Sequence, residues 1–590
     1  MTGAEGASGA GDSAVDTVIA DFNRAYAELT APGAPFAWTV HDVRGVPTRV
    51  FDSAPPHMRV IWELAGAKGD AEYLVYGSER YSYSDAAARV RSLAHHLRDE
   101  HAVGRGDRVA IGMRNYPEWV ISYWAITSLG AAAVALNSWW TGPELEFALA
   151  DSSPVVAILD GERLERLSQN AGTPALIVTR HEGDLPAGVS RWDDVVDVAG
   201  APARLPAAEI EPDDDIGIFY TSGTTGPPKG AQTTHRGSIH NLLNLAFIKY
   251  CGDAARARRL VEQGLAPEED PGAPVTLLPV PLFHVTGCTC VLHPVTATGG
   301  RLILMHHWDP AEALRLIERE RVTTVTGVPT MSRELLRHPD WGGTDTSSVR
   351  SMGGGGAALQ PDLVARIDTS LRRGSPVTGY GLTETTGIAT AIGSEFYVAK
   401  PESVGPVVPC MEAKVVDADG NDVATGEQGE LLLRGPNVIK GYLNNPEATA
   451  EAIVDGWFRT GDIAEIDVDG WIHIKDRAKD VVIRGGENVH CAEVEAALHE
   501  LDEVAEVAVF GVPDDRLGEE VAAAVMLGPD AELTADDLTA HLTGRLARFK
   551  HPRHVWFLDE PLPRNANGKF LKRDLRARLA PQTETAVLPE

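Results

Sequence analysis

Short apolar runs alternate with segments of helical pattern over most of the chain. Four runs come first, at 108–113, 131–137, 155–160 and 175–179, and five more follow at 216–220, 275–280, 301–305, 322–328 and 349–356. Buried strands that alternate with helices are typical of βαβ units. The pattern therefore predicts an α/β fold in which a large N-terminal domain contains mostly parallel sheets.

The pattern changes twice towards the C-terminus. AKVVDADG (413–420) and GELLLRG (429–435) resemble antiparallel hairpins with glycine-containing turns and predict a β-rich subdomain. From about residue 478, helical and strand patterns mix over roughly 110 residues, which is enough for a separate α+β domain. We expect an N-terminal domain over 17–478 and a small C-terminal domain over 479–590, with residues 1–16 disordered because Gly, Ala and Ser dominate them.

The uncharged stretch 119–143 is a candidate membrane span. Ser122, Thr127 and Asn137 interrupt it, whereas a spanning helix needs about 20 predominantly apolar residues. We interpret 118–130 as a buried helix and 131–137 as a buried strand, and we expect no membrane span.

Charge and cysteine content limit which partners, cellular location and metal sites we expect for this chain. The 590 residues carry a formal charge of −31, which disfavours nucleic acid and anionic membranes as partners. Five scattered cysteines indicate reduced thiols and a cytoplasmic location rather than a disulfide framework. The pair Cys288 and Cys290 lacks the partners of a zinc site, so we expect it to serve packing.

The loop YTSGTTGPPKG, at 220–230, is the first candidate for chemistry. It follows an apparent strand (216–220) and precedes an apparent helix from His235, an arrangement that directs N–H groups and hydroxyls at phosphate. Pro228 before Lys229 and Gly230 after it break the Walker A pattern, which disfavours a P-loop kinase or GTPase. The stretch alone leaves phosphate binding and a mobile surface turn equally open.

Further motifs follow in order: PLFHVTG (281–287), GGGGA (353–357), GYGLTET (379–385), GWFRTGD (456–462), KDRAKDVVIRGGENV (475–489) and NANGKFLKRDL (565–575). Together with the 220–230 loop, they closely resemble the signatures of the acyl-adenylate-forming superfamily, over roughly residues 50–580. The resemblance implies a large N-terminal domain and a small mobile C-terminal domain. It implies an ATP-dependent acid–CoA ligase that converts acid, ATP and CoA to acyl-CoA, AMP and pyrophosphate through an acyl-adenylate.

The resemblance also assigns site residues. It implies that Lys569 reaches the α-phosphate during adenylation, that Glu384 holds Mg²⁺, and that Asp462 and Arg477 hold the ribose, with Tyr380 on adenine. The ATP-binding set that it implies is Thr221, Ser222, Gly223, Thr224, Thr225, Gly226, Lys229, Gly355, Gly356, Ala357, Thr378, Gly379, Tyr380, Gly381, Thr383, Asp462 and Arg477. ATP, Mg²⁺ and coenzyme A are the implied cofactors and partners besides the acid, and a homodimer is allowed.

The sequence also gives expectations about the motion of the small domain and about the acid that the enzyme binds. The resemblance implies that Lys479 is the hinge about which the small domain rotates, and that Gly485 and Gly486 line the thiol tunnel. His284 would lie beside the substrate carboxylate. The other pocket candidates are Val285, Thr286, Gly327, Val328 and Ile388, with Gly355 and Gly381 at its edge. These residues are small or apolar and include no acid for an amino group, which favours a fatty or aromatic acid over an amino acid.

Three alternatives remain open. An acyl-AMP ligase could load a carrier protein, although no phosphopantetheine site is apparent near the C-terminus. A luciferase-type oxygenase would share the adenylation half. A catalytically dead adenylate-binding regulator is disfavoured by the presence of Lys569, Glu384, Asp462 and Arg477.

Overall fold

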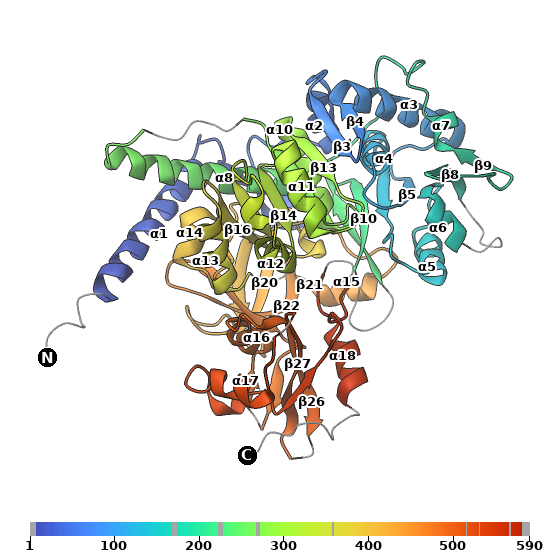
Figure 1. Cartoon of the computed structure of the whole chain (residues 1–590). Coiled ribbons are helices and arrows are strands. Elements are labelled where there is room, and N and C mark those ends of the chain that lie inside the picture. Colours follow the sequence, from blue (N-terminus) through green and yellow to red (C-terminus); the bar gives the residue numbers. More distant parts are fainter. Residues whose placement is uncertain are drawn as a thin grey trace, which may run out of the picture.

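The computed structural model contains two large mixed sheets, a third sheet that forms a β-rich subdomain, and a small separate lobe (Figure 1). The structure describes residues 8–167, 174–221, 228–266, 272–356, 359–485, 487–514, 516–529, 531–565 and 568–580. All statements below refer to these residues.

The first large sheet has seven strands in the order β11-β10-β6-β5-β7-β8-β9. Every neighbouring pair is parallel except β10 and β11, which form an antiparallel pair at one edge. The strands are β5 (Arg108–Gly112), β6 (Ala132–Ala135), β7 (Val156–Asp160), β8 (Ala175–Thr179), β9 (Val189–Arg191), β10 (Asp215–Thr221) and β11 (Lys229–Thr234).

The second large sheet has eight strands in the order β17-β16-β15-β14-β12-β13-β3-β4. Its six inner strands run parallel, as the sequence predicted, and β4 and β17 are antiparallel edges. The strands are β3 (Glu72–Tyr76), β4 (Glu79–Ser82), β12 (Val275–Leu278), β13 (Arg301–Leu304), β14 (Thr324–Gly327), β15 (Ser351–Gly354), β16 (Ser375–Tyr380) and β17 (Thr390–Gly393).

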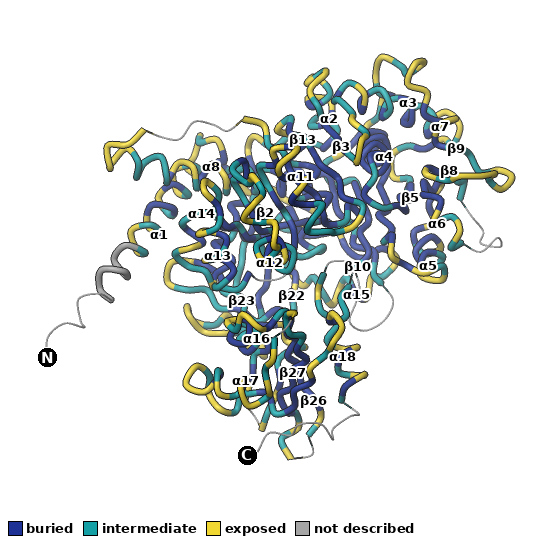
Figure 2. Tube along the Cα trace, in the orientation of Figure 1, coloured by how far each residue is buried: buried dark blue, intermediate teal, exposed yellow. Residues whose placement is uncertain are grey.

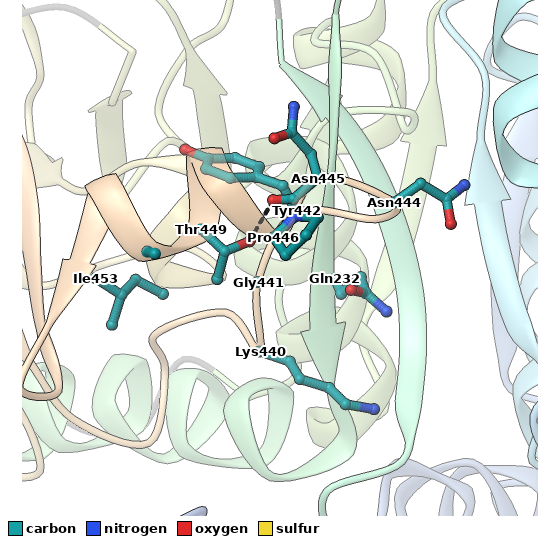
Figure 3. A pocket seen from close by; sticks show the side chains of 10 residues that line it. Gln232, Lys440, Gly441, Tyr442, Asn444, Asn445, Pro446, Thr449 and Ile453 are labelled. Atoms are coloured by element: carbon teal, nitrogen blue, oxygen red, sulfur yellow. Dashed lines mark hydrogen bonds between the residues drawn. The ribbon is translucent and has the colours of Figure 1, made fainter.

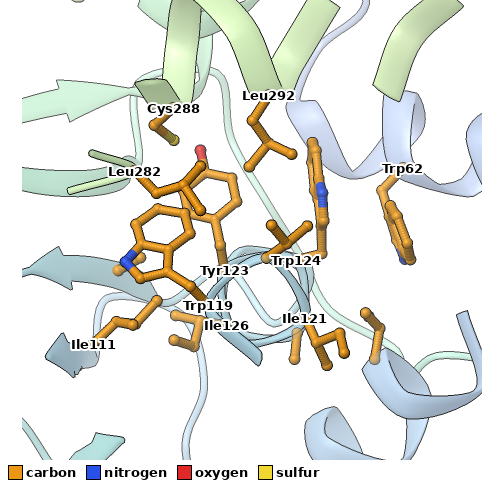
Figure 4. Close-up of a cluster of buried hydrophobic side chains, with 14 of the residues drawn as sticks. Trp62, Ile111, Trp119, Ile121, Tyr123, Trp124, Ile126, Leu282, Cys288 and Leu292 are labelled. Carbon is orange, nitrogen blue, oxygen red and sulfur yellow. The ribbon is translucent and has the colours of Figure 1, made fainter. Parts of the chain in front are cut away.

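Helix α4 (Pro117–Ser128) lies in the centre of the largest hydrophobic cluster, and all twelve of its residues are buried. Figure 4 shows its side chains, among them Trp119 and Trp124, pointing outwards on several sides into this cluster. The predicted buried helix and the buried strand β6 after it are both present. Among the described residues, no helix combines the length and the apolarity that crossing a membrane would require.

Other helices cover the faces and edges of these sheets. Most begin at a Pro in the first turn or at a Ser, Thr, Asp or Asn cap, as helix starts commonly do. They are α2 (Met58–Gly66), α3 (Tyr83–His101), α5 (Gly142–Ser152), α6 (Gly161–Arg166), α7 (Trp192–Val195), α8 (His235–Glu262), α9 (Val285–Gly287), α10 (His293–Thr298), α11 (Pro310–Glu320), α12 (Pro329–Arg337), α13 (Pro361–Ser370) and α14 (Ser394–Ala399).

The predicted β-rich subdomain is a sheet in the order β18-β23-β22-β20-β19, with β21 (Ile453–Val454) paired to β22. The strands are β18 (Gly405–Pro406), β19 (Glu412–Val416), β20 (Gly429–Arg434), β22 (Trp457–Ile466) and β23 (Trp471–Arg477). As predicted, β19 and β20 form an antiparallel pair. Helix α15 (Pro446–Ala452) precedes β21.

The chain enters a different sheet after β23. The small lobe contains the sheet β25-β24-β27-β26, with β28 beside β27, and its own buried clusters on both faces (Figure 2). Its elements are β24 (Val482–Arg484), β25 (Glu487–Val489), α16 (Cys491–His499), β26 (Val504–Asp514), β27 (Gly518–Leu527), α17 (Ala535–Leu542), β28 (His554–Phe557) and α18 (Lys572–Leu579). The expected boundary at 478/479 falls between β23 and β24.

The chain begins with helix α1 (Ser8–Thr30), while residues 1–7 lie outside the described part. Farther along the helix, Ile19, Phe22 and Ala25 are buried in the cluster that contains Phe247 and Phe396. This apolar face anchors α1, and the disorder expected for residues 1–16 stays a prediction. The hairpin of β1 (Trp38–Val43) and β2 (Val46–Phe51) follows.

Candidate functional site

The carboxyl ends of β14, β15 and β16 form one wall of the candidate site. Gly327 pairs with Gly354 in the parallel register, and a Cβ added at Gly354 would lie 2.2 Å from the carbonyl oxygen of Gly327. A Cβ added at Gly355 would lie 2.9 Å from the carbonyl oxygen of Gly379. Ligands of open α/β sheets bind at this edge, and the lack of side chains leaves backbone for a flat base to contact. Ala357 lies outside the described residues.

Three predicted nucleotide residues meet in one cluster. Asp462 and Arg477 are register partners on β22 and β23, and the Arg477 Nε to Asp462 Oδ1 distance is 2.8 Å. The hydroxyl of Tyr380 donates to Asp462 Oδ2 at 2.5 Å. Burial raises the pKa of Asp462, and Arg477 and Tyr380 oppose that shift. Each carboxylate oxygen keeps a second lone pair, so Asp462 can still accept from ribose hydroxyls.

Glu384 is held by a residue that the sequence analysis did not assign. It lies in the turn Thr383–Thr385 after β16, and the hydroxyl of Tyr442 donates to its Oε1 at 2.8 Å. Lys229 Nζ lies 5.0 Å from the centre of the Tyr442 ring. Burial raises the pKa of Glu384, while Tyr442, Arg477 and Lys229 act in the opposite direction. The segment KGYLNNPEAT contains Tyr442, but an aromatic residue there also fits a packing role, so the sequence alone did not single it out.

Tyr442 also borders an open hollow of about 460 Å³ (Figure 3). Thr449 accepts from the Tyr442 backbone N–H through its hydroxyl at 2.9 Å, which fixes this turn. The lining residues are Gln232, Lys440, Gly441, Tyr442, Asn444, Asn445, Pro446, Thr449, Ala450 and Ile453. The hollow therefore adjoins the Glu384 side of the site through one shared side chain.

The glycine- and threonine-rich loop connects two strands, not a strand and a helix. Lys229 begins β11, which pairs antiparallel with β10, and α8 begins only at His235. The predicted helix does begin at His235, but residues 229–234 complete the sheet edge between the loop and this helix, a strand that the sequence analysis did not expect. Thr221 and Lys229 face each other across this pair. Ser222, Gly223, Thr224, Thr225 and Gly226 lie outside the described residues.

His284 lies after β12, at the same sheet edge. Burial lowers its pKa to about 3, so the imidazole is neutral, and its buried Nε2 has no hydrogen-bond partner. Val285, Val328 and Ile388 are buried, while Thr286 is partly exposed. Thr378 is buried, and its hydroxyl lies near that of Tyr397. A purely structural role therefore also fits this residue, which the sequence placed in the ATP-binding set.

Asn241 connects the segment after His284 to the segment after Glu384 through hydrogen bonds. The sequence analysis did not assign this residue. Its amide donates to the Thr289 carbonyl at 3.0 Å and accepts from the Ile388 N–H at 2.9 Å. Thr289 in turn donates to the Thr386 carbonyl at 2.6 Å. These residues surround a π-helical turn, Cys288–Leu292. Such turns are frequent at functional sites.

Lys569 approaches this site from the small lobe. The side chain is exposed overall, but surrounding protein atoms and the charge of Arg477 lower its pKa, and Asp480 and Asp462 partly oppose this. A Cβ added at the preceding Gly568 would lie 2.9 Å from Val328 Cγ2. The lysine loop therefore contacts the predicted acid pocket, while Lys569 interacts electrostatically with Asp462.

The predicted hinge is an exposed turn between the domains. Asp480 N and Val481 N donate to the Arg477 carbonyl at 2.9 and 3.1 Å, with Lys479 exposed within the turn. Gly485 ends β24 with φ of +60°, and its N–H donates to the Leu517 carbonyl at 2.8 Å. Gly486 lies outside the described residues. The five cysteines are free thiols. Among the described residues, no cluster of three or more His, Cys, Asp or Glu side chains is arranged so that it could hold a metal ion.

Comparison with known proteins decides the family. The profile described as AMP-binding enzyme matches residues 61–443, and that of the AMP-binding enzyme C-terminal domain matches residues 493–569. This chain belongs to the AMP-binding enzyme family. The order of motifs, the α/β fold and the separate C-terminal domain predicted from the sequence agree with this membership.

Relatives of this AMP-binding enzyme are acyl-CoA ligases. A feruloyl-CoA synthase of Amycolatopsis sp is 38% identical over 504 residues, 85% of this chain and 95% of that protein. The long-chain-fatty-acid–CoA ligase FadD13 of Mycobacterium tuberculosis is 35% identical, over 83% of this chain and 92% of that one. The anthranilate CoA ligase AuaEII with anthranoyl-AMP superposes with a TM-score of 0.78 at 26% identity, over 89% and 98% of the two chains. The predicted enzyme class, an AMP-forming acid–thiol ligase that uses ATP and CoA, is confirmed.

Proposed function

We propose that this enzyme converts an aromatic carboxylic acid to its CoA thioester through an acyl-adenylate, with the residues described above in the roles that follow. The carrying observation is the convergence of Lys569, Arg477 and Asp462 beside the glycine-lined sheet edge. The similarity to a feruloyl-CoA synthase supports an aromatic acid. The similarity to a long-chain-fatty-acid ligase favours a fatty acid as the second candidate.

In the first half-reaction, a carboxylate oxygen attacks the α-phosphorus of ATP, and the bond to the bridging oxygen of pyrophosphate breaks. The carboxylate is already ionised at neutral pH, so no general base is required. Catalysis then consists of bringing two anions together and spreading charge in the transition state. Lys569 would contact the α-phosphate and the acid, while Lys229 would contact the outer phosphates.

Mg²⁺ fits the Glu384 side of the site. Mg²⁺ prefers oxygen ligands and is commonly bound by one or two carboxylates plus substrate phosphates. Glu384 offers such a ligand, and Tyr442 fixes one of its oxygens. Bound there, the ion would neutralise phosphate charge. The buried position of Glu384 raises its pKa, and the approach of a cation would favour the ionised form.

In the second half-reaction, the CoA sulfur attacks the acyl carbon. The new C–S bond replaces the bond to AMP, which leaves as an anion, while the thiol proton passes to solvent. Lys569 has no role in this step. The turn at Lys479 would let the small domain rotate, so that the Gly485 region faces the acyl-adenylate instead.

His284 is suited to hold the acid. A neutral imidazole whose buried Nε2 lacks a partner can donate to, or accept from, a polar group that enters the pocket. Val285, Val328 and Ile388 offer apolar walls around it. The pocket would thus combine one polar contact near the carboxylate with an apolar environment for the ring.

A panel of acids tests this proposal. Purified enzyme receives ATP, Mg²⁺, CoA and one acid at a time, from hydroxycinnamic, benzoic, indoleacetic and C8–C18 fatty acids, and both AMP release and thioester mass are measured. We expect the highest kcat/KM for an aromatic acid. A clear preference for fatty acids would select the second candidate, and adenylate formation without any CoA thioester would overturn the assignment of CoA as acceptor.

Two further features belong to the proposal. A cytoplasmic location is expected from the sequence, and a homodimer is allowed by it. The free, mostly buried cysteines of the described residues support a reducing environment. Sedimentation of the purified enzyme would decide the oligomeric state.

A further inference from the structure

Lys569 projects from a short hairpin whose two sides are cross-linked by Arg564. Asn565 N donates to the Lys569 carbonyl at 2.9 Å, and Leu571 N donates to the Pro563 carbonyl at 2.8 Å. The Arg564 Nη1 donates to the Gly568 carbonyl at 2.8 Å, and the guanidinium lies 4.0 Å from the centre of the Phe570 ring. One side chain therefore contacts the residues immediately before and after Lys569.

The same guanidinium is anchored in the core of the small domain. Arg564 Nη2 donates to Glu506 Oε1 at 2.9 Å, and the other oxygen of Glu506 accepts from Leu562 N at 2.7 Å. Glu506 is buried near the start of β26, where it is the register partner of Met526 on β27. Because Glu506 is fixed by the sheet, the geometry of the hairpin is transmitted from β26 through Arg564 to Lys569.

The hairpin also lies along α12 of the large domain. Gly568 contacts Val328, which precedes α12, and Arg564 acts electrostatically on Glu334 in the second turn of that helix. Burial raises the pKa of Glu334, and a hydrogen bond from Trp308 and the charge of Arg564 oppose that shift. Arg564 is therefore hydrogen-bonded to a carboxylate of its own domain and acts electrostatically on one of the large domain, in the arrangement that brings Lys569 to the site.

We propose that Arg564, anchored by Glu506, is a positioning residue that fixes the approach of Lys569 during adenylation and has no part in thioester formation. The inference rests on the proposed role of Lys569. A displacement of about 1 Å in a catalytic group can reduce a rate by about 100-fold. A guanidinium can hold a carbonyl, a carboxylate and a ring face at once, whereas an ammonium is a single point of charge.

The test compares Arg564→Met, Arg564→Lys and Glu506→Gln with wild type. Adenylation is measured by ATP–pyrophosphate exchange, and thiolation by acyl-CoA formation from pre-formed acyl-AMP and CoA. We expect Arg564→Met to lower the kcat of adenylation about 10- to 100-fold with a nearly unchanged KM for ATP, and to leave thiolation within about twofold. Arg564→Lys should retain part of the adenylation activity that Arg564→Met loses. Glu506→Gln should have an adenylation kcat between those of Arg564→Met and wild type.

Arg576→Met is the matched control. Arg576 lies on α18 of the same domain and forms an ion pair with Glu519 at 3.3 Å, away from the hairpin. It should leave both half-reactions unchanged. Because thiolation also needs a folded small domain, retained thiolation excludes general unfolding. Equal loss of both half-reactions in Arg564→Met and Glu506→Gln, or no loss in either variant, would overturn the inference.

Lys569→Ala in the same assays separates this inference from the proposed function. If Lys569→Ala abolishes exchange while Arg564→Met does not, the positioning role is wrong and the function stands. If wild-type enzyme shows no exchange with any acid of the panel, the proposed function itself is wrong.

Discussion

Glu384 and Asp462 are carboxylates that lie next to cations and still have raised pKa values. In both, burial is the largest cause, and neighbouring Arg477 only partly offsets it. In the free protein, the neighbouring positive charge is therefore too small to offset the burial of these two carboxylates. A ligand that brings a cation or hydroxyl donors would stabilise the ionised carboxylates.

Replacing Glu384 by Gln should lower adenylation about 10- to 100-fold or more, because one hard oxygen ligand and its charge are lost. The measurement is pyrophosphate exchange at increasing Mg²⁺ and ATP. Tyr442→Phe is the control, since it removes only the hydrogen bond to Glu384 and should cost far less. Near-wild-type exchange that does not respond to Mg²⁺ would show that Glu384 is no ligand.

Lys569→Ala should abolish adenylation and spare thiolation, because in the proposed cycle rotation of the small domain moves Lys569 away from the α-phosphate before the thiol attacks. Pyrophosphate exchange measures the first half, and acyl-CoA formation from supplied acyl-AMP measures the second. If thiolation is as badly impaired as adenylation, the role of Lys569 is wrong.

The pH dependence of adenylation should report Lys569. Its pKa is lowered from the ordinary 10.5, so it loses its proton at a lower pH than a free lysine. Since the charged form is required, kcat/KM, which reports the free enzyme, should decline on the alkaline side below pH 10.5. Lys569→Arg keeps its charge throughout this range and should lack the decline in its residual activity. An identical alkaline limb in that variant would assign the titration to another group.

Among the elements, β15 approaches its two neighbours, β14 and β16, more closely than side chains on β15 would allow. Gly353 and Gly354 have φ of +140° and +147°, a region that favours glycine, and their added Cβ atoms would overlap the carbonyl oxygens of Val377 and Gly327. The glycines at 353–356 therefore serve strand packing as well as the open edge at which we place adenine.

Gly354→Ala should destabilise the large domain by at least about 3 kcal/mol, because steric overlap and backbone strain add. The expected result is a lower thermal unfolding midpoint and less soluble protein. The control is Gly342→Ala, at a position with no atom within 4 Å of an added Cβ, where we expect a change within about 0.5 kcal/mol. Equal midpoints for the two variants would contradict the packing argument.

At the scale of the whole molecule, contacts away from the hinge hold the observed domain arrangement. Arg366 forms an ion pair with Asp502, and Arg337 donates to the Val504 carbonyl at 3.3 Å. Exposed ion pairs contribute about 0–1 kcal/mol. An interface of this kind costs little to break, which suits the proposed rotation of the small domain.

Lys479→Pro should separate the two half-reactions by at least about tenfold, or 1.4 kcal/mol of barrier. Proline fixes φ near −65° and removes a donor, so a turn that must adopt two conformations keeps at most one. Exchange and thiolation are measured separately, with Lys479→Ala as the control that leaves the backbone free. Equal loss of both halves in a folded Lys479→Pro variant would show that residue 479 is not the pivot.

The sequence by itself determined the family and the plan of a large domain followed by a small one, and it named the candidate residues of the site. Alternating apolar runs predict parallel sheets because strands buried on both faces need continuous apolar sequence. The motifs around Glu384, Asp462, Arg477 and Lys569 occur in an order that identifies the family without any contact information.

Only the tertiary structure decided how these residues are held. The roles of Tyr442, Asn241 and the Glu506–Arg564 pair depend on contacts between segments that are distant in the chain, and no local pattern encodes them. The strand β11 was missed because Lys229–Thr234 is extended through its pairing with β10. The apolar face of α1 is fixed by burial against Phe247 and Phe396, residues more than 200 positions away in the chain.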